Sequence, residues 1–163
     1  MAEQFEITDV MREKIGWESP PWTYEVSTTS VQAFARGVGY RDLVYYDADA
    51  AKRVDYPAVP APPTYLGTPH VIPGKSHPVF SGPISGGIDL ETGLPSIIDG
   101  ETEIEYFGTI CAGETLTAVT RLADLETKKS KAIGTMLLEK YETSYRNVAG
   151  ELLAVMRFQI IRF

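Results

Sequence analysis

The side chains of this sequence that most often act as bases, nucleophiles or metal ligands at neutral pH are His70, His77 and Cys111. The two histidines lie in a proline-rich stretch, and their spacing fits none of the common metal-ligand patterns. Cys111 has no basic neighbour in the sequence that would lower its pKa, and alone it can neither close an internal disulfide nor hold a zinc ion. We therefore expect solvated histidines and a small buried cysteine.

Several common chemistries are also missing as motifs. The sequence has no Gly-x-x-x-x-Gly-Lys phosphate loop, no Gly-x-Gly-x-x-Gly fingerprint, no His-Glu-x-x-His and no Gly-x-Ser-x-Gly. The net charge of −7 argues against a nucleic-acid partner. No apolar window reaches the 18 residues that a membrane span needs, and the first residues form no apolar signal segment. A cytoplasmic protein without a membrane partner is expected.

The 163 residues predict a single domain, 1–163, and its first third predicts helices and one strand. Helices are expected at 10–15, 31–38 and 48–53, and a strand is expected at 22–26. Asp9 and Asp47 are the predicted caps of the first and third helices, and Ser27 to Ser30 offer caps for the second. Residues 57–96 are dense in proline, so at most a short helix is expected there, from Pro62 or Pro63 to Pro69.

The remainder of the chain predicts strands. They are expected at 103–107, 116–125, 132–146 and 152–160, with turns at 111–114, 128–131 and 147–150. In the last strand, apolar residues recur at every second position from Leu152 to Ile160, which is typical of one buried face. Consecutive strands with short turns form an antiparallel meander, and its buried face must pack on the helices of the first half. The fold class is therefore predicted to be α+β.

Several segments, taken in order, resemble the MaoC-like dehydratase family, and specifically its N-terminal, FAS1-like dehydratase half. They are Lys14-Ile15-Gly16 with Pro21, the strand at 24–26, the loop at 38–47, Ala61-Pro62-Pro63-Thr64-Tyr65 and the turn at 107–116. The resemblance covers nearly the whole chain. It implies a hot-dog fold, in which an antiparallel sheet wraps a central helix (here short), and it implies that two such units pair.

Active members of that family hydrate or dehydrate acyl thioesters of coenzyme A or acyl carrier protein. A carboxylate and an imidazole facing one water move the protons, and backbone N–H groups polarise the thioester carbonyl, so no cofactor is required. The family supplies the pair as Gly-Asp-x-Asn-Pro-x-His. In this sequence Tyr40 stands at the Asp position and Tyr45 at the His position, and Pro62-Pro63 replaces the His-Gly of the downstream Ala-His-Gly. A phenol with a pKa near 10 is a poor base at neutral pH.

Three hypotheses follow from this departure. The first makes the chain the non-catalytic, acyl-binding partner of a second hot-dog subunit that carries the Asp/His pair. The second is a self-sufficient homodimeric hydratase that uses Asp42, or Asp47, with Tyr40 or Tyr45. The third is a non-enzymatic module that binds acyl thioesters. The resemblance implies substrate contacts at Tyr40, Tyr45, Thr64 and Tyr65, and the proline-rich loop 67–95 is expected to leave room for a bulky acyl group.

Overall fold

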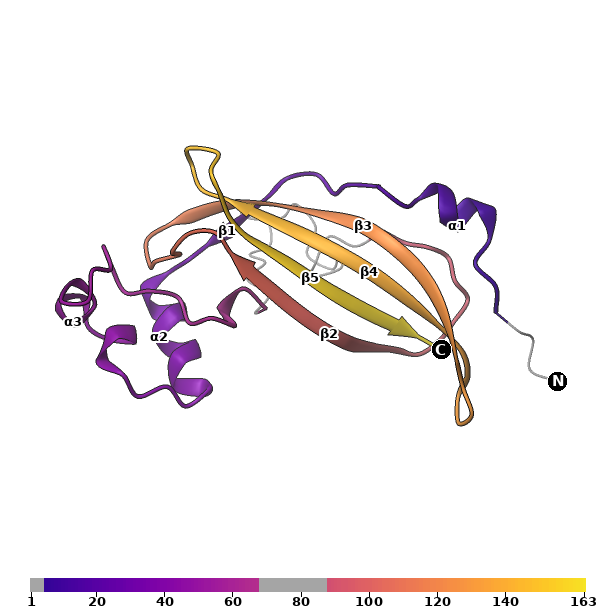
Figure 1. The fold of residues 1–163 in the computed structure, drawn as a ribbon, viewed down its shortest axis with the longest axis horizontal. Helices are drawn as coiled ribbons and strands as arrows, with labels where there is room; N and C mark the ends of the chain where they lie inside the picture. Colours follow the sequence, from indigo (N-terminus) through magenta and orange to yellow (C-terminus); the bar gives the residue numbers. More distant parts are fainter. Residues whose placement is uncertain (1–4, 68–87) are drawn as a thin grey trace.

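A five-stranded antiparallel sheet dominates the computed structural model, which describes residues 5–67 and 88–163 (Figure 1). Its strands are β1 (Trp22–Glu25), β2 (Ile97–Tyr106), β3 (Thr115–Ser130), β4 (Gly134–Arg146) and β5 (Leu152–Arg162). Their order in the sheet is β1-β3-β4-β5-β2. The short β1 therefore forms one edge of the sheet and the longer β2 forms the other. The predicted meander of the C-terminal half is confirmed as β3, β4 and β5.

Alternating side chains give the sheet a buried inner face and an exposed outer face. In β4 the residues from Glu139 to Tyr145 at every second position are buried, whereas Lys140 and Glu142 between them face outward. In the last strand Ala154, Met156, Phe158 and Ile160 pack against the inner clusters as predicted, but Leu153 and Val155 are buried as well, so burial along β5 does not alternate throughout. One expected turn is wrong. Lys128 to Ser130 continue the pairing of β3 with β4, and the turn follows at 131–133.

The helices come from the first third of the chain. They are α1 (Asp9–Glu13), α2 (Thr28–Gly37) and α3 (Ala48–Lys52), with short 3₁₀ turns η1 (Leu43–Tyr45) and η2 (Tyr65–Gly67). The predicted caps Ser27 and Asp47 are confirmed, since their side chains accept from the backbone N–H groups of Ser30 and Ala50. The predicted cap Asp9 is wrong: the cap is Thr8, whose hydroxyl accepts from Met11, and Asp9 is already helical.

The helix expected from Pro62 or Pro63 to Pro69 appears in the described residues only as the 3₁₀ turn η2. The last two residues of the expected helix, 68 and 69, and most of the proline-rich loop lie outside the described ranges. Helices in the part of the chain that the structure describes are all too short or too polar to cross a membrane.

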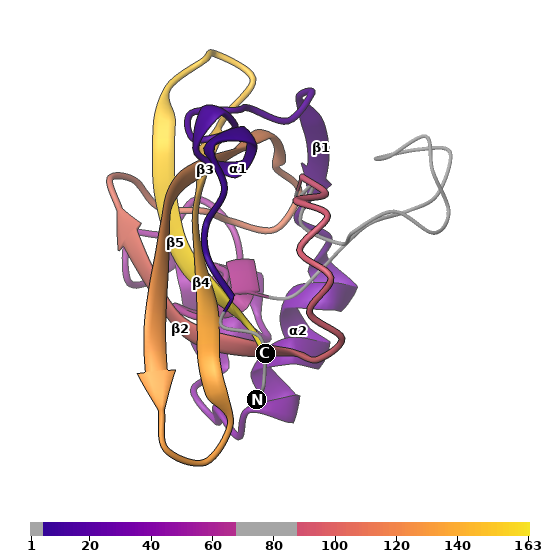
Figure 2. The ribbon, with the colours of Figure 1, turned by 90° about the vertical axis from the view of Figure 1, so that its right-hand side faces the viewer.

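Helix α2 packs over the inner face of the sheet near β1 (Figure 2). Val31 and Ala35 on one side of α2 are fully buried, and Phe34 packs against the same core. The sheet contributes Tyr24, Leu116, Ala118, Tyr145 and Ala154 to this cluster. The helix that the sequence predicts from its apolar spacing thus covers one half of the inner face.

A second hydrophobic cluster covers the other half of the inner face. Its buried members come from α1, from the segment before β2 and from the middle strands: Met11, Leu90, Leu122, Leu125, Leu137 and Tyr141. A charged pair lies within it, because the fully buried carboxylate of Glu139 contacts the guanidinium of Arg162. The Tyr141 hydroxyl donates to the same carboxylate at 2.9 Å. No local pattern in the sequence predicts this pair.

Candidate functional site

The segment in which the resemblance places the family's acid–base positions leaves the end of α2 as a loop that we call the tyrosine loop, residues 39–46. Gly39 adopts a φ of +84°, a left-handed conformation that favours glycine and turns the chain away from the helix axis. The N–H of Tyr40 then donates to the carbonyl of Ala35 at 2.9 Å. The helix end therefore fixes where the tyrosine loop begins.

The two tyrosines that the resemblance assigns to the family's Asp and His positions lie against each other. The rings of Tyr40 and Tyr45 stack with centroids 5.1 Å apart and planes 21° apart. The Tyr46 hydroxyl donates to the carbonyl of Tyr40 at 2.6 Å, and Gln32 of α2 donates to the carbonyl of Tyr46 at 2.9 Å. Tyr40 is 37% exposed and Tyr45 is half-buried. Stacking of its own aromatic rings thus stabilises the tyrosine loop, and a hydrogen bond from Gln32 joins the loop to α2.

The two nearby carboxylates serve as local caps. Asp42 accepts from the N–H of Val44 at 3.1 Å and caps η1, and Asp47 accepts from the N–H of Ala50 at 2.6 Å and caps α3. Each carboxylate satisfies a backbone donor that a helix start would otherwise leave open. This arrangement favours a structural role for Asp42 and Asp47. The second hypothesis gives them an acid–base role instead.

The environment of Tyr45 makes its phenolate, the form that could act as a base, scarcer than in a free tyrosine. Burial raises the pKa of Tyr45 above its ordinary value, and the neighbouring Tyr40, Tyr56 and then Asp42 raise it further. Because an unperturbed phenol already titrates near pH 10, the neutral form prevails at pH 7. A neutral phenol can donate a hydrogen bond, but it cannot take a proton from water as a carboxylate does.

The capping geometry of Asp42 gives a stability prediction. Replacing Asp42 with alanine is expected to lower the free energy of unfolding by about 1 kcal/mol, because the N–H of Val44 loses its acceptor. Asp42→Asn is expected to keep most of that stability, since asparagine caps helix starts as well as aspartate. Urea unfolding of both variants measures the difference. Equal losses in the two variants would contradict a capping part for this carboxylate.

Tyr65 lies in the core, beneath α2. Its side chain has an exposed fraction of 0%, and its hydroxyl shares a hydrogen bond with the Ser30 hydroxyl of α2. Its ring meets those of Tyr24 and Phe34 edge-on, with centroids 6.0 and 5.7 Å apart. Thr64, in contrast, is exposed. Among the four predicted substrate contacts, Tyr40 and Thr64 are therefore open to solvent, and Tyr65 holds its segment against α2.

The proline run beside Thr64 is fixed on both sides. The Ala61 N–H donates to the carbonyl of Ile110 at 2.8 Å, and the Tyr106 hydroxyl at the end of β2 donates to the carbonyl of Pro63 at 2.6 Å. Pro62 and Pro63 have no N–H, and the N–H of Tyr65 donates to the carbonyl of Pro62. Ala61, Pro62, Pro63 and Tyr65 therefore offer no N–H group that could polarise a thioester carbonyl.

Cys111 is buried as expected, with 3% exposure, and burial raises the pKa of its thiol. It lies opposite Pro60 in an isolated β-bridge, which fits a structural part. His70 and His77 lie outside the described residues. Within the described ranges no group of three or more His, Cys, Asp or Glu side chains is placed to hold a metal ion.

The aromatic cluster of the inner face was not predicted from the sequence as a unit. Trp22, Tyr24 and Tyr145 meet edge-on, with ring centroids 5.7 to 6.2 Å apart. The Nε1 atom of Trp22 is buried without a hydrogen-bond partner among the residues that the structure describes. Alternation in the first strand places Trp22 and Tyr24 on one face, which was the available signal. The pairing of that strand with β3, almost a hundred residues later in the chain, was not visible in the sequence.

Comparisons with known proteins agree with this architecture. The family described as "FAS1-like, dehydratase domain region" matches residues 13–156. A UPF0336 protein of Saccharopolyspora erythraea is 30% identical over 115 residues, which are 70% of this chain and 69% of the relative. A protein of Thermomonospora curvata named "probable enoyl-CoA hydratase alpha subunit" is 22% identical over 144 residues. The match covers 85% of this chain but 45% of that relative, so this chain spans less than half of its length.

Two solved structures from Mycobacterium tuberculosis share the fold at low sequence identity. In the ChsH1-ChsH2 complex, one chain superposes with a TM-score of 0.72 at 19% identity, covering 96% of this chain and 90% of that one. In the HadBC (3R-hydroxyacyl-ACP dehydratase) complex the TM-score is 0.66 at 17% identity, covering 96% and 99%. The predicted hot-dog fold is confirmed by these likenesses. By its sequence match over residues 13–156, the chain belongs to the family of FAS1-like dehydratase domain regions.

Proposed function

We propose that this chain is the non-catalytic, acyl-binding subunit of a hydro-lyase that adds water to enoyl thioesters or removes it from 3-hydroxyacyl thioesters. A second hot-dog subunit would supply the carboxylate and the imidazole. The observation that carries the proposal is the stacked pair Tyr40 and Tyr45, which stands where the family places its acid–base pair. Two phenols cannot both abstract a proton from water and protonate the α-carbon at neutral pH.

The comparisons support a two-subunit assembly in general terms. The Thermomonospora relative is named as an alpha subunit of an enoyl-CoA hydratase, and both solved structures are complexes of two different proteins. In the proposed assembly, the exposed Tyr40 and Thr64 contact the acyl thioester from this side. Tyr65 keeps Thr64 in place through its hydrogen bond to α2. No cofactor is needed, because the reaction moves only protons and water.

The self-sufficient homodimer has less support. Its carboxylate, Asp42, is engaged by the backbone of η1, and the pKa of its phenol Tyr45 is raised rather than lowered. The non-enzymatic module would bind acyl thioesters in the same way, but it would not contribute to hydration by a catalytic subunit. Activity measurements on the separate and the combined chains distinguish all three.

The test measures the loss of enoyl absorbance from crotonyl-CoA. The purified chain alone is expected to show only the background rate. Co-expression with a hot-dog protein of the same genome that carries Gly-Asp-x-Asn-Pro-x-His is expected to raise the rate about 10²–10⁴-fold above this chain alone, the usual contribution of positioned acids and bases. Equal rates for that partner with and without this chain would favour the non-enzymatic module.

A double substitution checks the part of the phenols. Tyr40→Phe with Tyr45→Phe keeps the stacked rings but removes both hydroxyl groups. Hydration by the two-subunit complex is expected to keep its kcat, because neither hydroxyl moves a proton, whereas KM reports any lost contact with the thioester. If this chain alone turned over the substrate, and if the double substitution abolished that turnover, the homodimer hypothesis would be supported instead.

A further inference from the structure

One row of side chains crosses the inner face of the sheet from edge to edge. The strand register places five residues next to one another in this row, one from each strand: Trp22, Ala118, Tyr145, Ala154 and Tyr106. Both alanines are fully buried, and each leaves room above its Cβ atom for the rings beside it. Trp22 and Tyr145 meet across Ala118 with ring centroids 6.2 Å apart.

Two hydrogen-bond donors in this row lack an acceptor within the described part of the chain. The Nε1 atom of Trp22 is buried without a partner there. The side chain of Tyr145 is 1% exposed, and no hydrogen bond joins its hydroxyl to another residue of the described ranges. Buried polar groups are almost always paired, because an unpaired one loses its water without compensation. Two such donors side by side point to an acceptor that comes from a ligand.

The hydroxyls of two neighbouring tyrosines do have acceptors. Tyr24 donates to the carbonyl of Tyr65 at 3.2 Å, and Tyr106 donates to the carbonyl of Pro63 at 2.6 Å. These two carbonyls flank Thr64, the exposed residue that the proposed function places against the thioester. The two paired hydroxyls therefore join the segment around Thr64 to the sheet.

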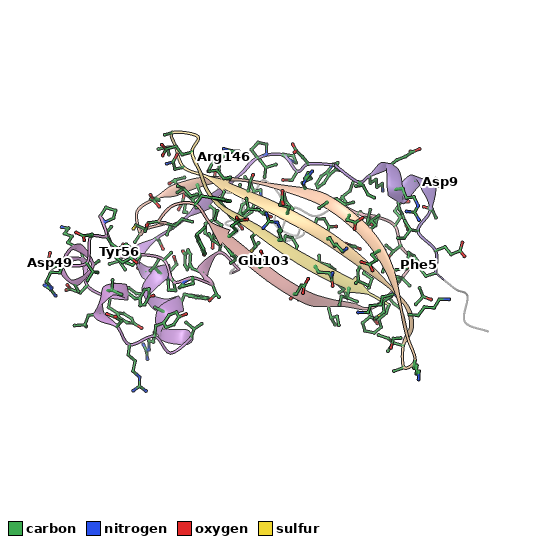
Figure 3. The ribbon with its side chains drawn as sticks, viewed as in Figure 1. Phe5, Asp9, Asp49, Tyr56, Glu103 and Arg146 are labelled. Carbon is green, nitrogen blue, oxygen red and sulfur yellow. The ribbon has the colours of Figure 1, made fainter. Side chains whose placement is uncertain are left out.

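Tyr145 lies between that segment and Trp22. Its ring meets the ring of Tyr24 edge-on, with centroids 5.7 Å apart. Burial, and then the nearby Tyr106, raise the pKa of Tyr145, so its hydroxyl keeps its proton at neutral pH and can donate it in a hydrogen bond. Arg146, the next residue, is labelled in Figure 3 and lies toward the same end of the long axis as Tyr56. The unpaired donors thus lie at the end of the sheet that faces the tyrosine loop.

The next row on the same face has a further spare proton. Thr120 and Thr143 are buried opposite each other, two positions along from Ala118 and Tyr145. Their hydroxyls share one hydrogen bond of 2.9 Å, which uses one of their two protons. The other proton has no acceptor among the residues that the structure describes. This part of the inner face therefore has donors to spare.

We propose that this part of the inner face binds the acyl group of the thioester, and that the acyl group carries a keto oxygen, remote from the thioester, to which Trp22 and Tyr145 donate. The inference rests on the proposed function and names the class of acyl group. A keto oxygen has two lone pairs and no proton of its own, so it matches a pair of donors, whereas an alkyl chain would leave both unpaired.

The position of Trp22 gives the acyl group a route to these donors. Its side chain is only half-buried, and it belongs to the edge strand β1. In the ligand-free chain the surrounding side chains close over Nε1, so binding must move the rings apart. Pairing two donors that are otherwise unpaired offsets the cost of that movement. A plain alkyl chain brings no such compensation.

Calorimetric titration of the full chain with a matched set of ligands tests the class of acyl group. Decanoyl-CoA and its 6-, 7-, 8- and 9-oxo derivatives have chains of one length and differ only in the keto oxygen. At least one oxo derivative is expected to bind about 3- to 10-fold more tightly than decanoyl-CoA, the usual effect of a hydrogen bond.

The outcomes separate this inference from the proposed function. If decanoyl-CoA binds and every oxo derivative binds equally or more weakly, the inference is overturned and the acyl-binding function stands. If none of the ligands binds, both are overturned. A preference for an oxo derivative supports the inference whether or not a catalytic partner is found.

Single substitutions locate the keto oxygen. Trp22→Phe and Tyr145→Phe each keep an aromatic ring but remove one donor, and each is expected to lower the preference for the best oxo derivative about two- to threefold. Trp17→Phe and Tyr141→Phe are the matched controls, and they are expected to leave the preference unchanged, since the Tyr141 hydroxyl already donates to Glu139. A preference that all four variants retain would place the oxygen elsewhere and overturn the inference.

The unfolding midpoint of the free chain gives a measurement without ligand. Tyr145→Phe is expected to lower the midpoint in urea less than Tyr141→Phe, because only Tyr141 gives up a hydrogen bond. An equal or larger decrease for Tyr145→Phe would show that its hydroxyl already has a partner, and would overturn the inference. If a variant fails to fold, the ligand preference of the native chain still decides.

Discussion

Replacing Arg162 with methionine is expected to lower the free energy of unfolding by about 3 kcal/mol, the lower end of the usual loss for a buried ion pair, because the Arg162 side chain is 27% exposed. Glu139 is fully buried, and among the residues that the structure describes its carboxylate keeps only the hydroxyl of Tyr141 as a donor once the guanidinium is gone. An isolated charge in an apolar cluster must be neutralised or hydrated, and either costs folding free energy. Guanidinium or urea unfolding at pH 7 measures the loss.

Two variants isolate the cause. Glu139→Gln combined with Arg162→Met removes both charges and is expected to recover a large part of the loss, because no unpaired charge remains. Arg121→Met breaks the exposed pair with Glu142, which is 3.3 Å long, and is expected to cost at most about 1 kcal/mol. If Arg162→Met lowers the free energy of unfolding no more than Arg121→Met does, the pair of Arg162 with Glu139 behaves as a solvated surface pair, contrary to the burial of Glu139.

Raising the pH from 10 to 11 is expected to remove about 3 kcal/mol of stability, about 1 kcal/mol for each of three tyrosines. Burial raises the pKa values of Tyr24, Tyr141 and Tyr145 above the value of 10 that the unfolded chain has. A group whose pKa is higher in the folded state holds its proton more tightly there. Its contribution is therefore complete below pH 10 and is lost as the pH rises further.

Unfolding titrations at several pH values between 8 and 11 check this dependence. Tyr145→Phe keeps a ring of the same shape in the core and is expected to reduce the slope above pH 10 by about a third, because one titrating group is gone. A free energy of unfolding that stays level from pH 9 to pH 11 would show that these phenols titrate as in the unfolded chain.

Local signals in the sequence predicted most elements correctly. Ser27 and Asp47 cap α2 and α3 because their short side chains reach the first free N–H groups, and the neighbouring residues already show this pattern. In β5 the alternating apolar residues predicted which side chains reach the inner clusters, but not the burial of Leu153 and Val155 between them. The wrong cap at Asp9 has an equally local cause: Thr8, one residue earlier, satisfies the same kind of N–H group.

The features that the sequence did not predict depend on contacts between distant residues. Glu139 and Arg162 are 23 positions apart and meet because β4 and β5 bring them to the same end of the inner face. The burial of Tyr65 depends on Ser30 of α2 and Tyr24 of β1, neither of which is near in the chain. For the candidate site, the sequence indicated which residues depart from the family pattern, but the stacking of Tyr40 on Tyr45 required the folded loop.

The strand order has a consequence for synthesis on the ribosome. β1 and β2 both find their neighbours in the C-terminal half, since Trp22 lies opposite Ala118 and Ile104 lies opposite Met156. Translation proceeds at about 5–20 residues per second, so the first strand waits several seconds in the nascent chain before β3 emerges. During that interval Trp22 and Tyr24 have no sheet to cover them, which makes this stretch the natural target for a chaperone that shields emerging aromatic residues.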